Sequence, residues 1–181
     1  MDETSMRLTQ FFSRLLLTFF SATLLLSCTD ADESQPQELF SGAAAHWVSA
    51  DRIIWDAPEG AASYRLYFSD TAGLIVTDTN INGEEYFELL PNATLPAELS
   101  DQFRHIADRQ VFSLDERESS IKRALKGQLI AIALDENDEP IRATKLQIHG
   151  VLDDLFIYEG TLGPVYNSDG LELNLWAPTA Q

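Results

Sequence analysis

The chain has 181 residues, and its 29 acidic side chains outnumber its 12 basic ones, giving a formal net charge of −17. A surface this acidic repels nucleic-acid phosphates and anionic lipid headgroups, so we expect no nucleic-acid partner. Such acidity is typical of a protein that must stay soluble outside the cell.

The first predicted element is a secretion signal. Residues 15–26 are almost wholly apolar, and the chain's single cysteine, Cys28, follows shortly after them. Such a run is too short to span a bilayer core, which needs about 20 residues. The motif Leu-Leu-Ser-Cys, ending at Cys28, resembles the lipobox of bacterial lipoproteins, in which the cysteine is acylated and becomes the new N-terminus. We therefore expect residues 1–27 to be a lipoprotein signal peptide and Cys28 to carry the lipid.

The alternative for this end is an ordinary secretory signal with one buried thiol, since a single cysteine cannot form an internal disulfide. In lipoproteins an Asp directly after the acylated Cys tends to retain the protein at the inner membrane, and here Thr29 follows. We therefore expect an extracytoplasmic protein anchored to the outer membrane or cell surface. Residues 28–44 are polar and acidic with few large apolar side chains, which predicts a flexible tether.

Short apolar strands separated by turns begin at residue 45. The sequence predicts strands over 46–48, 53–55, 63–69 and 74–77. Alternation in 63–69 places Tyr64, Leu66 and Phe68 on one face, with Arg65 and Tyr67 on the other. The dipeptide at 82–83, Asn-Gly, indicates a hairpin that leads into a strand over 86–90.

Helical spacing appears next. Leu95, Leu99, Phe103 and Ile106 recur with a helical period, and Thr94 precedes them as a candidate N-cap. A shorter helix is predicted over 116–126, with the glycine at 127 as its C-terminal stop.

The second half of the chain returns to strands. Residues 128–134 are apolar at every position, which favours a central strand covered on both faces. A turn over 135–139 leads to strands over 141–143 and 146–148, with a break near Lys145, and 151–166 predicts mixed strand and loop. Residues 45–166 therefore predict a mainly β fold: an immunoglobulin/fibronectin-like antiparallel β-sandwich with one or two short helical insertions.

The sequence carries no motif for nucleotide binding, zinc binding or nucleophilic catalysis of the Gly-rich, Cys-x-x-Cys, His-Glu-x-x-His or Gly-x-Ser-x-Gly types. His46, His105 and His149 are far apart along the chain, whereas zinc sites usually show local ligand pairs. The adjacent Asp153 and Asp154 do not suit a glycosidase carboxylate pair, and the acidic turn at 135–139 lacks the glycine of a calcium loop. We expect no catalytic residue, metal site or cofactor in this chain.

Aromatic residues are the remaining candidates. Their phase predicts that Trp55 and Tyr64 fill the sandwich core. Trp47 and Tyr67 are less constrained, so each is a candidate for stacking on a glycan ring, with packing as the alternative.

The last residues predict one more strand. Residues 171–181 end in a Trp-Ala-Pro motif followed by three further residues. Because a lone strand buries no face, we expect 167–181 to be a linker and the opening strand of a further domain. Trp176 should then be less well packed than Trp55.

Several short motifs, in this order, resemble the N-terminal region of bacterial pullulanase-type α-1,6-glucosidases. They are Ala45-His-Trp-Val48, Ile53-Ile-Trp-Asp-Ala-Pro58, Ala61-Ala-Ser-Tyr-Arg-Leu-Tyr67, Leu125-Lys-Gly-Gln-Leu129, Val151-Leu-Asp-Asp-Leu155, Gly160-Thr-Leu-Gly163 and Leu175-Trp-Ala-Pro-Thr-Ala-Gln181. The resemblance implies that 45–166 is a pullulanase N2 β-sandwich and that 167–181 opens a domain of the carbohydrate-binding family 48 type.

In that family an amylase-type (β/α)8 barrel follows and carries all catalytic carboxylates, and such a barrel takes about 250 residues. It hydrolyses the α-1,6 links of pullulan, starch and glycogen. Many Gram-negative members are surface lipoproteins exported by type II secretion. The resemblance thus implies an anchoring and accessory region whose partners are α-glucan through the parent enzyme, the membrane through its lipid, and the type II secretion machinery. Calcium is a candidate cofactor of the parent only. The alternative is a stand-alone lipoprotein β-sandwich that binds α-glucan or a protein partner.

Overall fold

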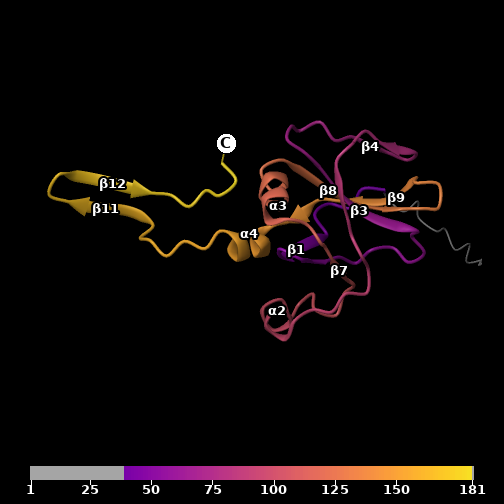
Figure 1. Ribbon diagram of the computed structural model, residues 1–181, viewed down its shortest axis with the longest axis horizontal. Helices are drawn as coiled ribbons and strands as arrows, with labels where there is room; N and C mark the ends of the chain where they lie inside the picture. The colour runs from indigo at the N-terminus through magenta and orange to yellow at the C-terminus, as the bar shows by residue number, and fades with distance from the viewer. Residues whose placement is uncertain (1–38, 181) are drawn as a thin grey trace, which may run out of the picture. The chain divides into compact units, whose positions relative to one another are not determined.

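The structure is a computed structural model that describes residues 39–180 (Figure 1). The predicted signal peptide at 1–27, the lipidation site at Cys28 and most of the predicted tether lie outside these residues. None of the helices in residues 39–180 is both long enough and apolar enough to cross a membrane.

One four-stranded sheet holds the longest strands. Its order is β6-β3-β8-β9, and every neighbouring pair is antiparallel. Its strands are β3 (Ser63–Ser69), β6 (Tyr86–Glu88), β8 (Gln128–Leu134) and β9 (Pro140–Thr144). β3 and β8 pair over seven residues each, with Leu66 opposite Ala131, so these two strands form the centre of the sheet as their apolar patterns predicted.

The second four-stranded sheet has the order β10-β1-β2-β7. Its strands are β1 (Ala45–Ser49), β2 (Arg52–Ile54), β7 (Val111–Ser113) and β10 (Leu146–Gln147). β2 runs antiparallel to both β1 and β7, while β10 runs parallel to β1 with Ala45 opposite Leu146. The parallel pair departs from the all-antiparallel sandwich that the sequence predicted.

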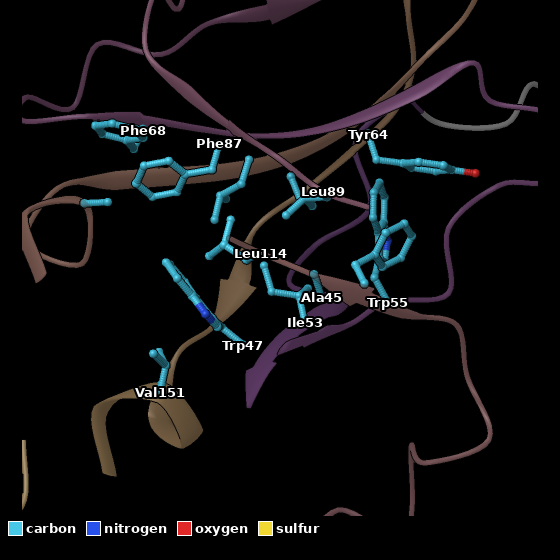
Figure 2. Close-up of a cluster of buried hydrophobic side chains, with 14 of the residues drawn as sticks. Ala45, Trp47, Ile53, Trp55, Tyr64, Phe68, Phe87, Leu89, Leu114 and Val151 are labelled. Atoms are coloured by element: carbon cyan, nitrogen blue, oxygen red, sulfur yellow. The ribbon is translucent and has the colours of Figure 1, made fainter. Parts of the chain in front are cut away.

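The core lies between the two sheets (Figure 2). Trp47, Ile53 and Trp55 reach it from one sheet, and Tyr64 and Leu66 reach it from the other. The Trp55 and Tyr64 rings meet edge to face with centroids 6.2 Å apart, a favourable geometry for two aromatic rings. The predicted β-sandwich and the core positions of Trp55 and Tyr64 are therefore confirmed.

β8 is covered on both faces, as its continuous apolar run predicted. Ala131 and Ala133 face the core between the sheets, while Ile130, Ile132 and Leu134 belong to a second cluster on the outer face. Small alanines on the inner face leave room for the large aromatic side chains of the opposite sheet.

Three short helices occur in residues 39–180, one more than the upper limit of the prediction. They are α2 (Ala97–Gln102), α3 (Glu118–Ala124) and α4 (His149–Leu155). α3 lies within the predicted range. α2 is shorter than its apolar spacing predicted, and the residue at its N-cap is Pro96, so the prediction that Thr94 caps the helix is wrong.

The prediction of mixed strand and loop over 151–166 is wrong for residues 151–155, which belong to α4, whereas the loop that follows and the strand β11 (Gly163–Asn167) agree with it. Val151 of α4 is fully buried in the main core, and Figure 2 shows it beneath Trp47. Gly150 makes this possible: a Cβ there would lie 2.8 Å from the Val48 carbonyl oxygen. Because it has no side chain, Gly150 allows α4 to approach β1 closely.

The break near Lys145 marks a change of sheet. The chain leaves β9 in one sheet and enters β10 in the other. Thr144, which is fully buried, fixes this corner: its hydroxyl oxygen accepts from the Ala44 N–H at 2.8 Å and its hydroxyl donates to the Ser41 carbonyl at 2.7 Å.

Part of the predicted tether is ordered against the sandwich. The Ala143 N–H donates to the Leu39 carbonyl at 2.7 Å, and the Ser41 N–H donates to the Ala143 carbonyl at 2.9 Å. Residues 39–44 therefore extend the fold by pairing with β9, and the predicted tether is corrected to end before them.

The hairpin predicted at Asn82-Gly83 is wrong. The turn instead lies at 78–79, between β4 (Val76–Thr77) and β5 (Asn80–Ile81). The Asn82 side chain is used differently, because its Oδ1 accepts from the Ile75 N–H at 2.7 Å and its Nδ2 donates to the Gly73 carbonyl at 2.8 Å. The asparagine closes a wider loop through its amide rather than forming a two-residue turn.

The final strand has a partner earlier in the chain. β12 (Gly170–Asn174) pairs with β11 (Gly163–Asn167) as an antiparallel hairpin, so the prediction of an unpaired terminal strand is wrong. The boundary expected between residues 166 and 167 falls inside this hairpin. Leu171 and Leu173 are each 60% exposed, and Trp176 is 39% exposed whereas Trp55 is fully buried, as we expected.

Candidate functional site

Trp47 and Tyr67, the two predicted glycan contacts, are buried. Trp47 is 0% exposed in the main core, and Tyr67 is 4% exposed in the cluster on the outer face of β3 and β8. Leu74 belongs to that outer cluster, and Val76 packs against it, so the loop after β3 covers the Tyr67 ring. Neither ring presents a free face to a sugar, so the glycan prediction for both is corrected to packing within the domain.

The three histidines come together although they are distant in sequence. His46 on β1 is 8% exposed, and the His105 ring stands edge-on to it with centroids 6.3 Å apart. Burial lowers the pKa of His46, and the nearby charges of Arg109, His105 and His149 lower it further. Within residues 39–180 no group of three or more His, Cys, Asp or Glu side chains is arranged to hold a metal ion.

Two of the acidic residues considered in the sequence, Asp154 and Asp135, bind backbone amides. The Asp154 carboxylate accepts from the Ala50 N–H at 2.8 Å, joining α4 to the turn between β1 and β2. Asp135 Oδ1 accepts from the N–H groups of Asn137 and Glu139, both at 2.8 Å, and these bonds lower the pKa of Asp135. Both carboxylates therefore have the structural role that the sequence favoured.

Two further carboxylates form a surface ion-pair network. The Arg123 guanidinium of α3 lies 2.9 Å from Asp70 and 2.7 Å from Glu85, and it also lies over the Phe68 ring. The hydrogen bond from Arg123 is the main reason why the pKa of Glu85 is lowered. These two ion pairs hold the loop after β3 against α3.

Exposed aromatic side chains gather just beyond α4, in a surface hollow that we call the aromatic groove. Its volume is about 330 Å³, and it is lined by Asp153, Phe156, Ile157, Tyr158, Leu162 and Trp176. The Trp176 indole N–H donates to the Phe156 carbonyl at 2.9 Å, which fixes Trp176 at the edge of the groove.

The rings of the aromatic groove remain accessible. Tyr158 is 50% exposed and Trp176 is 39% exposed. The third ring, that of Phe156, has the Lys122 ammonium over it at 4.9 Å from the ring centre. Asp153 makes no hydrogen bond or ion pair with any other residue in 39–180, so its carboxylate is free to accept one. Sequence reasoning missed this site because its members lie on segments separated by about twenty residues, and only their aromatic character is visible beforehand.

The sequence profile of the pullulanase N2 domain matches residues 42–154 of this chain. The chain belongs to the pullulanase N2 domain family. The match spans the whole sandwich and ends within α4. Of the groove residues, Asp153 lies inside the N2 match and the other five lie beyond it, so the aromatic groove is at the C-terminal border of the N2 domain.

Curated relatives agree with this assignment. The chain is 36% identical over 139 residues to chloroplastic pullulanase 1 of Arabidopsis thaliana and 30% identical over 142 residues to a pullulanase of Klebsiella pneumoniae. These alignments cover 76% and 77% of this chain but only 14% and 13% of the relatives. The chain with its N2 domain therefore spans about one seventh of their length.

Solved structures resemble the same region. Apo pullulanase from Klebsiella pneumoniae superposes with a TM-score of 0.68 at 30% identity, covering 77% of this chain and 15% of that one. Klebsiella pneumoniae pullulanase complexed with maltotriose gives a TM-score of 0.68 at 30% identity, and the match covers 77% of this chain and 13% of that one. The N2 sandwich described above is thus similar to a part of a much longer pullulanase.

Proposed function

We propose that this chain is the N-terminal anchoring and accessory region of a surface pullulanase. The observation that supports the proposal is the N2 match over residues 42–154, together with relatives named as pullulanases, of which the alignments cover only 14% and 13%. The parent enzyme would hydrolyse α-1,6 links in pullulan, starch and glycogen, with its catalytic carboxylates outside this chain. Its α-glucan substrate is the expected partner, and calcium remains a prediction for the parent alone.

The anchoring part of the proposal rests on the sequence around Cys28. Each buried CH2 group of a lipid chain contributes about 0.8 kcal/mol to membrane affinity, so an N-terminus with two or three acyl chains stays attached. The anchor would hold the N2 domain at the outer membrane or cell surface, and export would use the type II secretion machinery.

The accessory role is tested by an assay of the chain alone. The purified chain should release no reducing sugar from pullulan under conditions in which Klebsiella pneumoniae pullulanase releases it readily. The structure agrees with this expectation for four carboxylates, because Asp154 and Asp135 bind backbone amides while Asp70 and Glu85 bind Arg123. Debranching by the purified chain would overturn the proposal that the catalytic residues lie elsewhere.

A further inference from the structure

We propose that the aromatic groove is an α-glucan-binding subsite at the C-terminal border of the N2 domain. The choice of α-glucan as the ligand class rests on the proposed function, whereas the site itself is argued from the side chains that line it. Nothing in the sequence motifs marks these residues as a site.

The rings supply the surface that a sugar needs. A glucose ring presents an apolar face of C–H groups, which packs well on an exposed aromatic face. Tyr158 is 50% exposed and Trp176 is 39% exposed, and Phe156, which lines the same groove, is only partly buried. The hydrogen bond from the Trp176 indole to the Phe156 carbonyl holds the indole in place before any ligand arrives, which limits the loss of side-chain entropy on binding.

Charge distinguishes between ligand classes. The net charge of −17 and the Asp153 carboxylate in the groove disfavour anionic ligands such as phosphates and acidic peptides. A neutral sugar is not repelled, and its hydroxyl groups can donate hydrogen bonds to Asp153. An apolar protein surface laid over the groove would instead bury that carboxylate without a partner, which is costly.

Size limits the occupant to a short segment. A volume of about 330 Å³ is at the small end of ligand sites, so the groove holds a few glucose units of a chain rather than a whole oligosaccharide. Binding of a single short ligand should therefore be weak, and many repeated units in a polymer should raise the apparent affinity.

The test uses the full chain, purified in detergent. In native gels containing glycogen, the wild-type chain should be retarded, and Trp176→Ala and Tyr158→Ala should each weaken the retardation by about tenfold. Asp153→Asn should weaken it less, because an amide oxygen still accepts a hydrogen bond. Tyr166→Ala is the matched control, since Tyr166 is a more exposed aromatic residue, at 80%, that lies outside the groove, and it should leave retardation unchanged.

Fluorescence gives a second readout in the unmodified chain. Trp47 and Trp55 are fully buried, so maltotriose should shift the emission of Trp176 alone and protect it from a soluble quencher, and a β-linked trisaccharide should do neither. Trp176→Phe should keep most of the retardation, and unchanged thermal unfolding of each variant would show that the sandwich is intact.

Two outcomes would overturn the subsite. The first is that glycogen does not retard the wild-type chain in the native gel. The second is that glycogen still retards a double variant that carries both Trp176→Ala and Tyr158→Ala. Neither bears on the proposed accessory role, which fails only if the chain proves catalytic or is found apart from a pullulanase.

Discussion

His46 is a buried residue whose side chain can gain a charge as the pH falls. It shares β1 with Trp47, but its ring can take a charge, and the groups within residues 39–180 that shift its pKa include no carboxylate. Burial comes first among the causes that lower the pKa of His46 below its usual 6.5, followed by Arg109, His105 and His149. The folded chain therefore binds a proton at His46 less readily than the unfolded chain does.

The sign of the effect on stability follows. As the pH falls below about 6.5, the unfolded chain binds this proton before the folded chain does, so the free energy of unfolding decreases. His46→Gln should make the free energy of unfolding less dependent on pH, as measured by urea denaturation at about pH 7.5 and about pH 5.5. His149→Gln, a change at an exposed position, is the control and should alter this dependence less. An unchanged pH dependence in His46→Gln would contradict the account.

The β11–β12 hairpin exposes its two leucines to solvent. Leu171 and Leu173 are each 60% exposed, whereas Leu66 on β3 is fully buried between the sheets. Replacing both hairpin leucines with threonine should change the free energy of unfolding by less than about 0.5 kcal/mol, because neither is part of the core.

The matched comparison is Leu66→Thr, which removes a core side chain and buries a hydroxyl, and it should cost about 2–5 kcal/mol. Chemical denaturation monitored by the fluorescence of the buried tryptophans measures both. A large loss of stability from the hairpin substitutions would mean that the sandwich depends on the hairpin.

Elements with strong local patterns could be predicted from the sequence, and those decided by tertiary contacts could not. The bounds of β3 and β8 follow from their apolar runs, which are buried on the faces that alternation assigns. α4 could not be predicted, because Gly150 is required by the close approach to Val48, a contact invisible in the sequence. Asn82 was misread for a similar reason, since its side chain binds backbone groups of Gly73 and Ile75.

The candidate site shows the same division. The aromatic character of Trp47 and Tyr67 was visible, but their burial depends on the opposite sheet and on the loop after β3. Trp176 lines the groove, and its indole bonds to the Phe156 carbonyl, a tertiary contact that the sequence does not reveal. The sequence therefore predicted which residue types matter, while tertiary packing decides which of them are accessible.

At the scale of the whole molecule, the N2 domain is one part of a longer anchored enzyme in our proposal. The lipid anchor predicted at Cys28 can be tested separately from the fold. Cys28→Ser should abolish labelling by radioactive fatty acid and release the protein from the membrane fraction, because the acylated thiol is the attachment point. Persistent labelling of the variant would show that the lipid is attached elsewhere or that the anchor is wrong.

The central claim is that this N2 domain belongs to a pullulanase, and antibodies raised against residues 45–166 test it most directly. Added to a detergent extract of the source cells' membranes, they should remove the pullulan-hydrolysing activity, and the captured protein should be several times larger than 20.2 kDa and stain for debranching in a native gel. Capture of a protein of about that mass, with the activity left in the extract, would contradict the account and favour a stand-alone lipoprotein.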